Sequence, residues 1–459
     1  MPGAFSGISM TANALRFFQR AMETTGHNIA NVNTEGYSRQ TVEFKTSIPL
    51  TIYSQGFKAM GTGVSVSAIK RIRDGYLEAN ARSNTSDLSK FQMLSAALKQ
   101  IEGAYREPGD EGIAAAMDKF FDAWSALGSN PTDTAARVQV QNAGSILAGR
   151  IRSTHNQMRS LENQLNSSTN SVIDRINELG REISTLNSEI REFSATAGSP
   201  NDLLDLRDKA VRELSGLINT QVETFEDGSY AVYAAGFPLV DSTGSREIDK
   251  NYDASSGTFT SLGITFNVRS GELAGLLQAT STLGSEKAQL DLLANELRTQ
   301  FNTLHQTGID ADGNTGNDFF NDSSPQSGAI DFDLSAVIKA SPRAIAAGTS
   351  GTPGDGGLAL SMAQMRDNAI VALGNKTFHD YHQTNVGQIG SQAAYYKSAE
   401  ETENAIALQI QSQVEAVSGV SIDDEMAEMM RYQRSYQAAA RALTVFDQIT
   451  EDLIGMLRR

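Results

Sequence analysis

The sequence predicts an elongated, rod-like α+β protein with several domains. Apolar residues recur with alternating spacings of three and four at both ends of the 459-residue chain. The span 133–193 contains no proline and only three glycines, so it can form one long helix. The span 200–357, in contrast, is rich in Gly, Ser, Asp and Thr and contains runs of β-branched and aromatic residues. The sequence therefore predicts a helical part, then a β-rich insert, then a second helical part.

The two ends of the chain predict a pair of terminal helices. Their spacing is typical of a heptad seam, although threonines and Glu425 interrupt it. We expect the pair to form a coiled coil that contributes to assembly; two ordinary amphipathic helices on a globular core are the alternative. The seam consists of Ile8, Leu15, Phe18, Met22 and Ile29 near the start and Met429, Tyr432, Tyr436, Leu443, Phe446, Leu453 and Leu457 near the end.

A cluster of turn formers follows the first helix. Asn31, Asn33, Thr34 and Gly36 are residues that end helices and tolerate unusual backbone angles. The stretch Tyr37, Ser38, Arg39 and Gln40 comes next and opens an alternating, strand-like pattern. We expect the cluster to end the inner helix and redirect the chain outwards. Tyr37 and Arg39 could then contact a neighbouring subunit, or Arg39 could simply be solvated.

The middle of the chain predicts a helical shaft and a β-rich insert. The apolar stripe from Leu161 to Phe193 predicts a helix of about 60 residues, or about 90 Å, packed with others in a rod. Asp227-Gly228 predicts a hairpin turn, residues 257–268 predict a second strand pair, and helical patterns return at 273–304 and from 358 onwards. The expected domains are a terminal-helix domain (1–32 and 425–459), a helical rod domain (33–200 and 358–424, with a β-hairpin-like segment near 37–72) and a β-rich outer insert (201–357).

Composition excludes several classes of function. The net charge of −16 and the absence of a basic block argue against nucleic acid as a partner. The chain has no cysteine, which excludes disulfides and zinc–thiolate sites. The start MPGAFSGISM has neither the basic segment nor the apolar core of a cleavable signal peptide, and no window approaches about 20 apolar residues, so no membrane span is expected.

Candidate chemical sites are incomplete, so we predict a protein that is not an enzyme and has no cofactor. His379 and His382 lie three residues apart but lack the other residues of a metal motif. The stretch 310–320 begins like a calcium loop, yet Thr315 and Asn321 stand where such a loop needs Gly and Glu. We expect an Asx-rich turn that opens into a strand there. The GxG of residues 60–67 lacks the other parts of a phosphate loop and is interpreted as a glycine-hinged strand.

Several segments resemble the bacterial flagellar axial proteins of the rod, hook and hook-associated group. These segments are IANVNTEGYSRQ at 29–40, GTGVSVSAIKRIRDGYLEANAR at 61–82, NDLLDLRDKAVRELSGL at 201–217, SGELAGLL at 270–277 and the C-terminal helix from 418 onwards. The Tyr37-Ser38-Arg39-Gln40 variant is similar to the hook-associated branch. Ser418-Gly419-Val420-Ser421 stands where rod and hook proteins have an Asn-Val-Asn lead.

The resemblance implies a structural adaptor that forms a homo-oligomeric ring at the distal end of the hook and joins hook to filament. It also implies contacts with the hook protein and a second junction protein, and an export chaperone on the C-terminal helix. Export without a cleavable signal peptide would place the protein in the extracellular flagellum. The compact β-rich insert implies that an outermost domain is reduced or absent. A rod or hook protein is one alternative; a surface adhesin and an enzyme displayed on a flagellar scaffold are others.

Overall fold

The computed structural model describes residues 2–46, 50–53, 57–60, 63–196, 199–322 and 328–457. The chain divides into two compact units, and helices α2, α4 and α9 contribute residues to both. The first unit comprises Met1–Asp87, Arg175–Ile248 and Glu403–Arg459, and the second comprises Leu88–Asp174 and Asp249–Thr402. The three-part domain organisation expected from the sequence stays a prediction.

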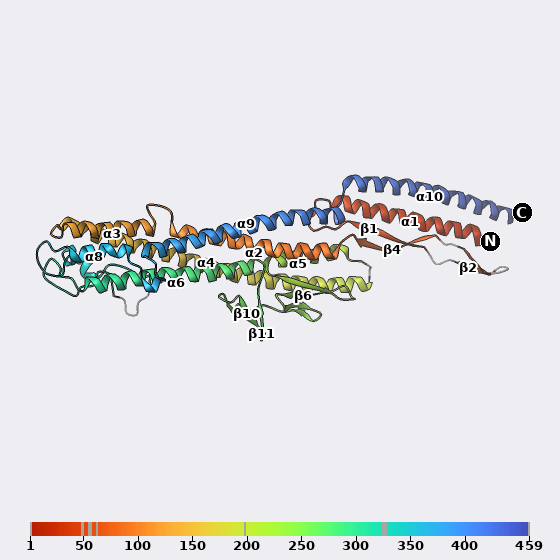
Figure 1. Cartoon of the computed structure of the whole chain (residues 1–459). Helices are drawn as coiled ribbons and strands as arrows, with labels where there is room; N and C mark the ends of the chain where they lie inside the picture. Colours follow the sequence, from red (N-terminus) through yellow and green to blue (C-terminus); the bar gives the residue numbers. More distant parts are fainter. Residues whose placement is uncertain are drawn as a thin grey trace. The chain divides into compact units, whose positions relative to one another are not determined.

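Helices account for most of the described residues, and the strands form small antiparallel sheets (Figure 1). The helices are α1 (Pro2–Ala30), α2 (Gly75–Tyr105), α3 (Ile113–Ser129), α4 (Thr134–Thr196), α5 (Asn201–Leu217), α6 (Glu272–His305), α7 (Ala336–Ala340), α8 (Gly357–Gln364), α9 (Phe378–Ser418) and α10 (Ile422–Leu457), with short 3-10 turns η1 (Pro342–Ala344), η2 (Met365–Asp367) and η3 (Val371–Leu373). The strands are β1 (Gln40–Thr46), β2 (Leu50–Tyr53), β3 (Phe57–Met60), β4 (Val64–Arg71), β5 (Thr220–Thr224), β6 (Tyr230–Ala234), β7 (Phe237–Asp241), β8 (Gly244–Ser245), β9 (Tyr252–Asp253), β10 (Thr258–Ser261) and β11 (Ile264–Asn267). The predicted α+β class is confirmed.

The long helix predicted between 133 and 193 is confirmed as α4. It spans 63 residues without a break, which corresponds to about 95 Å at 1.5 Å per residue. Its apolar stripe is buried along its length, from Val140 through Ile176 to Ile190. A helix of this length fits the rod-like fold that the sequence predicts.

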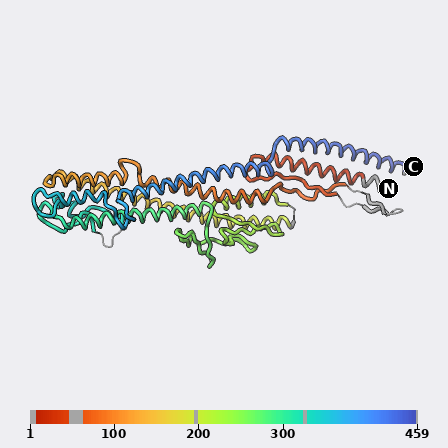
Figure 2. The backbone as a smooth tube through the Cα atoms, viewed as in Figure 1, coloured from red at the N-terminus to blue at the C-terminus, as the bar shows by residue number. Residues whose placement is uncertain are grey.

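In the first unit, the two terminal helices run antiparallel and side by side (Figure 1, Figure 2). A Cβ atom placed on Gly7, near the start of α1, would lie 2.7 Å from the Phe446 ring, late in α10. A Cβ atom on Gly26, near the end of α1, would lie 3.8 Å from Met429, early in α10. The pairing of the terminal helices within one chain is therefore direct, with a glycine at each end of the contact.

A two-stranded ribbon of β1 and β4 covers another side of α1. The strands pair antiparallel, with an irregularity between Glu43 and Phe44. Phe17 and Ala21 of α1 are buried against Val42 of β1, and Ile69 of β4 packs on the same cluster. β2 and β3 form a second hairpin within the segment 37–72. Part of the predicted glycine-hinged strand, residues 61 and 62, lies outside the described residues.

The four-stranded sheet β5-β6-β7-β8 packs on the C-terminal part of α4. Gly180 of α4 permits this contact because a Cβ atom there would lie 3.1 Å from Leu239. Asn187 of α4 donates to the Tyr230 carbonyl at 2.8 Å and accepts from the Tyr230 amide at 3.1 Å. The predicted hairpin at Asp227-Gly228 is confirmed by the pairing of β5 with β6.

The second unit is built around a cluster of aromatic side chains. Phe120 and Trp124 of α3 pack with Phe301 of α6 and with Phe319 and Phe320 of the following loop. All five side chains are buried, so this cluster is the core of the unit. The predicted helix at 273–304 and the strand pair at 257–268 are confirmed as α6 and β10–β11.

Two local expectations in the second unit are wrong. The stretch after Asp310 does not open into a strand; Ile309 and Phe320 make only isolated bridges there. The region from 358 onwards does not begin as a long helix, because the short α8 is followed by 3-10 turns before α9 starts at Phe378. Gly374, with φ of +71°, lies at the end of η3, in a backbone region that favours glycine.

Candidate assembly site

The turn formers after α1 make a compact, locally hydrogen-bonded turn. The Asn31 side chain donates to the His27 carbonyl at 3.0 Å, and the Thr34 hydroxyl donates to Asn31 Oδ1 at 3.1 Å. Asn33 is exposed, and Gly36 has φ of +84°, which an L side chain rarely adopts. The turn therefore ends α1 and leads the chain into the stretch 37–40.

The acidic residue that interrupts the C-terminal heptad seam is buried. Only 2% of Glu425 is exposed. It accepts a hydrogen bond from Arg39 Nε at 2.6 Å and another from Asn28 Nδ2 at 3.0 Å. Tyr37 joins them, because its hydroxyl donates to Asn28 Oδ1 at 2.7 Å. We call Asn28, Tyr37, Arg39 and Glu425 the Glu425 cluster; it connects the end of α1, the stretch 37–40 and the start of α10.

The surroundings of Tyr37 in the Glu425 cluster keep its hydroxyl protonated, so that it can donate a hydrogen bond. Burial, together with the nearby charges of Asp202, Asp205 and Glu425, raises the pKa of the Tyr37 hydroxyl well above its ordinary value. The protonated hydroxyl can therefore donate to Asn28 throughout the physiological pH range. The backbone amide of Arg39 adds a further link by donating to the Ser418 carbonyl at 3.0 Å.

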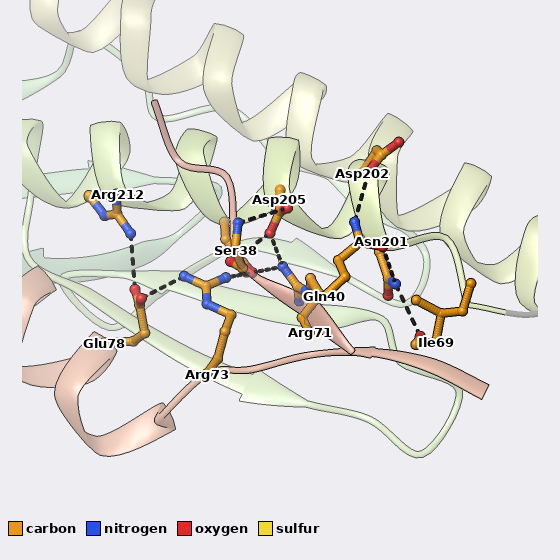
Figure 3. Close-up of polar contacts among 11 residues, drawn as sticks. Ser38, Gln40, Ile69, Arg71, Arg73, Glu78, Asn201, Asp202, Asp205 and Arg212 are labelled. Atoms are coloured by element: carbon orange, nitrogen blue, oxygen red, sulfur yellow. Dashed lines mark hydrogen bonds and ion pairs between the residues drawn. The ribbon is translucent and has the colours of Figure 1, made fainter. Parts of the chain in front are cut away.

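A second polar cluster lies where Ser38 and β4 meet α5 (Figure 3). Asp205 Oδ1 accepts from the Ser38 hydroxyl at 2.9 Å and from Arg71 Nη1 at 2.6 Å. Arg71 also donates to Asp208 at 2.8 Å, and the Arg73 guanidinium contacts the same Asp208 carboxylate. We call Ser38, Arg71, Asp205 and Asp208 the Asp205 cluster. Each of its three charged side chains is at least 88% buried.

Two further contacts extend the Asp205 cluster along α5 and to α2 (Figure 3). Gln40 accepts from Asn201 Nδ2 at 3.0 Å. Glu78, in the first turn of α2, pairs with Arg73 at 2.7 Å and with Arg212 of α5 at 3.1 Å. Burial opposes the ionisation of Glu78, but the two guanidinium groups hold its pKa below the ordinary value. The carboxylate is therefore charged and paired at neutral pH.

The two clusters bring together four segments that are far apart in the sequence: residues 28–40, 71–78, 201–212 and 418–425. Sequence reasoning singled out these segments but missed the acidic partners Asp205, Asp208 and Glu425. A carboxylate inside a heptad seam was the available signal for Glu425. Asp205 and Asp208 gave no such signal, because charged residues on an amphipathic helix usually mark its solvated side.

A groove of about 840 Å³ lies beside the Glu425 cluster. One wall contains Tyr37 and Arg39, and the other contains the apolar side chains of Ile410, Val414 and Val417 on α9. Both walls belong to the first unit. The groove therefore places the end of α9 opposite the stretch that follows α1.

The predicted seam residues occupy the terminal helices as follows. Ile8, Leu15, Phe18, Met22 and Ile29 of α1 and Met429, Tyr432, Tyr436, Leu443 and Phe446 of α10 are partly buried. Leu453 is 38% exposed, and the side chain of Leu457 lies outside the described residues. Tyr432 packs against the Phe17 cluster within the same chain. Contacts of these residues with a neighbouring subunit stay a prediction.

Sequence reasoning missed a set of exposed apolar side chains on α10. They form two short rows with a spacing of four, which places the members of each row on one side of the helix. The first row is Ile422, Met426 and Met430, and the second is Val445 and Ile449; each side chain is at least 43% exposed. We call them the first and second apolar rows. The repeated spacing of four was the signal in the sequence.

The candidate chemical sites have ordinary structural contacts. Asp310 accepts from the amides of Asp312 and Asn314, so this stretch is the expected Asx turn. His382 lies 3.3 Å from Glu107. Over the described ranges, no group of three or more His, Asp or Glu side chains is arranged to hold a metal ion. Likewise, none of the described helices has the length and apolar character that crossing a membrane requires.

Comparisons with known protein families match three parts of the chain. The profile of the flagellar hook-associated protein FlgK helical domain matches residues 98–320. The flagellar basal body rod FlgEFG protein C-terminal profile matches residues 411–456, and the flagella basal body rod protein profile matches residues 9–37. The two terminal matches cover most of α10 and most of α1, and the middle match contains α4.

Curated relatives match nearly the whole chain. Flagellar hook-associated protein 1 of Bacillus subtilis is 26% identical, with 99% of both chains covered. The protein of the same name from Salmonella typhimurium is 25% identical, covering 98% of this chain and 99% of its own. Among solved structures, the flagellar hook junction protein FlgK from Burkholderia pseudomallei has a TM-score of 0.66 at 18% identity, covering 74% of this chain and 100% of its own. The chain is therefore similar over nearly its whole length to flagellar hook-associated protein 1, and these likenesses indicate a structural protein of the hook–filament junction of the bacterial flagellum.

Proposed function

We propose that the chain assembles as a homo-oligomeric ring at the distal end of the hook and that α10 carries the contact between neighbouring copies. The observation that carries this proposal is the pair of exposed apolar rows on a helix whose other side packs on α1. Contiguous exposed apolar side chains mark interaction surfaces in soluble proteins. Covering them in an assembly would remove them from water.

Charge supports the choice of α10 as the contact. The chain carries a net charge of −16, so copies that approach one another repel over most of their surface. The first and second apolar rows contain no ionisable side chain. A contact that uses these rows gains from the burial of their apolar side chains.

The predicted seam residues have a complementary role in this proposal. Met429, Leu443 and Phe446 hold α10 on α1, so that each copy presents its two apolar rows on a helix of fixed orientation. The Glu425 cluster sets the register of that pair, as single polar residues do in coiled coils. The terminal helices then line the inside of the axial assembly.

The remaining roles rest on the likeness to flagellar hook-associated protein 1. We propose that the ring contacts the hook protein on one side and a second junction protein on the other, and that an export chaperone binds α10 before assembly. Export without a cleavable signal peptide would place the chain in the extracellular part of the flagellum. The proposed role is structural and involves no catalysis, cofactor, nucleic acid or membrane.

A matched pair of variants tests the contact. Val445→Glu introduces a charge into the second apolar row, whereas Gln448→Glu introduces the same charge one turn away without removing an apolar group. Each variant would be added to isolated hooks, and the bound protein would be counted by electron microscopy. We expect Val445→Glu to lose most of its binding and Gln448→Glu to retain it, with unchanged circular dichroism spectra. Binding of folded Val445→Glu at the wild-type level would refute the proposal.

A further inference from the structure

A groove of about 630 Å³ lies between α1 and β4 in the first unit. Its described lining belongs to these two elements alone, and α10 contributes no residue to that lining. Val64 and Val66 of β4 form the apolar side of the groove, and each is 38% exposed. Because alternate residues of a strand point to the same face, the two valines form one apolar strip. In the single chain this strip faces water.

The opposite side of the groove belongs to α1 and is polar. Arg20 forms an exposed pair with Glu23 at 3.1 Å. Arg16 is also exposed, and no described residue forms an ion pair with it. The α1 side therefore has a cation near its start and a carboxylate at its end. The residues of α1 that line the groove are Asn13, Arg16, Phe17, Gln19, Arg20 and Glu23.

The charge of the chain is distributed unevenly. Residues 1–73, which include both sides of the groove, contain eight Lys and Arg and three Glu, a net charge of +5, whereas the remaining residues carry −21. The helix α10 contains seven Asp and Glu and three Arg. A basic surface on an otherwise acidic chain favours an acidic partner, and α10 of a second copy has this character.

One side of α10 matches the groove in charge and in length. Arg441, Val445, Ile449 and Asp452 stand at positions i, i+4, i+8 and i+11, so they lie on the same side of the helix. All four are exposed. The second apolar row is thus preceded by a cation and followed by a carboxylate. At about 1.5 Å per residue, residues 441–452 and the groove residues 13–23 both span about 15–17 Å.

The direction of the helices decides which ends meet. Within one copy α1 and α10 run antiparallel. Copies related by rotation about an axis along the helices keep this relation between α1 of one copy and α10 of the next. In such an arrangement Asp452 faces Arg16. At the other end of the groove Arg441 faces Glu23, and the apolar strip of β4 covers the second apolar row.

The first apolar row does not match the groove. Asp423 precedes this row and Arg434 follows it on the same side of α10. In the antiparallel arrangement Arg434 would face Arg16, and Asp423 would face Glu23. Like charges would then meet at both ends of the groove, which is a common way of excluding a wrong partner. Charge therefore selects the second row.

From this match we propose that the groove between α1 and β4 of one copy receives the second apolar row of the next copy, with Asp452 opposite Arg16. This inference rests on the proposed contact through α10 and adds the surface that receives it. The groove and the row are different surfaces of the same chain, so the contact is heterologous. It passes from copy to copy in one direction and builds a closed ring or an open helix.

Charge reversal tests the pairing in the hook-binding assay. Arg16→Glu and Asp452→Arg should each lower binding about tenfold, with unchanged circular dichroism spectra, because like charges then meet across the contact. The double variant carries both changes in every copy and should regain most of the binding. Lys45→Glu is the matched control, because Lys45 is an exposed cation of β1 that does not line the groove. It should bind like the wild-type chain.

Two results of this assay would overturn the inference: unchanged binding of Arg16→Glu, or no recovery in the double variant. If Val445→Glu still loses its binding, either result would show that α10 docks on a different surface, so that the assignment of the groove alone is wrong. Wild-type binding of Val445→Glu would instead refute the proposed contact itself.

Cross-linking on isolated hooks tests the position of the contact. The chain has no cysteine, so variants with one cysteine each can be mixed, and a short bismaleimide joins two different copies in every product. Copies with Ser65→Cys should be joined to copies with Gln448→Cys, beside the second apolar row. They should not be joined to copies with Gln433→Cys, which lies about 22 Å away along α10. Predominant joining to Gln433→Cys would overturn the inference, as would the absence of both products.

Discussion

Arg39 and Glu425 are separated by 386 residues, yet Arg39 Nε lies 2.6 Å from Glu425 Oε1. The pair joins the stretch after the first helix to the start of the last. It also explains why a carboxylate stands in an otherwise apolar seam, because Glu425 accepts hydrogen bonds from the buried Asn28 and from the partly buried Arg39. A polar pair of this kind fixes the register of two helices more narrowly than apolar contacts do.

Removing the arginine should weaken the docking of α10. Arg39→Ala leaves the buried Glu425 carboxylate without its cation, so we expect a loss of about 1–3 kcal/mol in the free energy of unfolding of the first unit. Arg20→Ala removes an exposed pair with Glu23 and should cost less than about 0.5 kcal/mol. Urea titration followed by circular dichroism measures both. Equal losses would show that the Arg39 pair contributes no more than a surface pair.

The Asp205 cluster predicts a large difference between two neighbouring aspartates. The Asp205 side chain is 10% exposed and accepts from Ser38 and Arg71, whereas that of Asp202 is 69% exposed. Asp205→Asn leaves the buried Arg71 charge partly uncompensated and should cost about 3 kcal/mol or more. Asp202→Asn should cost less than about 1 kcal/mol. The same unfolding titration distinguishes them, and a cost for Asp202→Asn as large as that for Asp205→Asn would contradict the assignment.

Because α1 and α10 pack antiparallel, we expect two glycine substitutions in α1 to change the free energy of unfolding in opposite directions. At Gly7 a new Cβ atom would lie 2.7 Å from the Phe446 ring, so Gly7→Ala should force the helices apart and cost about 1–3 kcal/mol. At Gly26 the nearest atom would lie 3.8 Å away, so Gly26→Ala should stabilise α1 by up to about 1 kcal/mol through helix propensity. Thermal unfolding of the two variants checks this. Stabilisation by Gly7→Ala would show that the ends of the helices do not pair as described.

The second unit should lose stability in mild acid because of His305. Its Nδ1 donates to the Asn317 carbonyl at 2.6 Å, and its Nε2 accepts from the Ala346 amide at 3.0 Å, so the folded chain holds the neutral ring. Burial lowers the pKa of His305, and burial also lowers that of His155. Below about pH 6.5 the unfolded chain binds protons that the folded chain does not, so the free energy of unfolding falls as the pH decreases through this window. Denaturant titrations between pH 7.5 and 5 measure the slope.

His305→Gln supplies the comparison for that slope. It removes one of the two buried rings whose pKa is lowered, so its stability should depend less steeply on pH than that of the wild-type chain. The variant is expected to be less stable at every pH, because the buried partners of the ring lose their hydrogen bonds. The test therefore depends on the change in the slope of the free energy of unfolding against pH, and the overall loss of stability does not enter it. An unchanged slope would assign the pH dependence to other groups.

The sequence predicted elements whose signals are local. The absence of proline over 133–193 was enough for α4, and Asp227-Gly228 was enough for the hairpin of β5 and β6. The start of α9 was missed, because the pattern after Leu358 continues to look helical while the backbone turns at Gly374. Local pattern alone does not show where tertiary contacts favour a turn over a helix.

The candidate site was predicted less completely, because its partners are distant in the sequence. Tyr37 and Arg39 were identified, but Arg39 was expected either at a subunit contact or in solvent. It instead pairs with Glu425 in the same chain. The acidic residues of α5 appear in the sequence as a solvated side of an amphipathic helix. Only the fold shows that Ser38 and Arg71 face Asp205.

A cryo-electron microscopy map of the hook–filament junction, in which side chains are resolved, would show whether the apolar rows of α10 form the contact between copies. We expect Met430 and Val445, which are 52% and 58% exposed in the single chain, to be covered by a neighbouring copy of the same protein. We also expect Arg39 and Glu425 to remain paired within each copy. A map in which Met430 and Val445 both face solvent would show that the apolar rows do not form this contact.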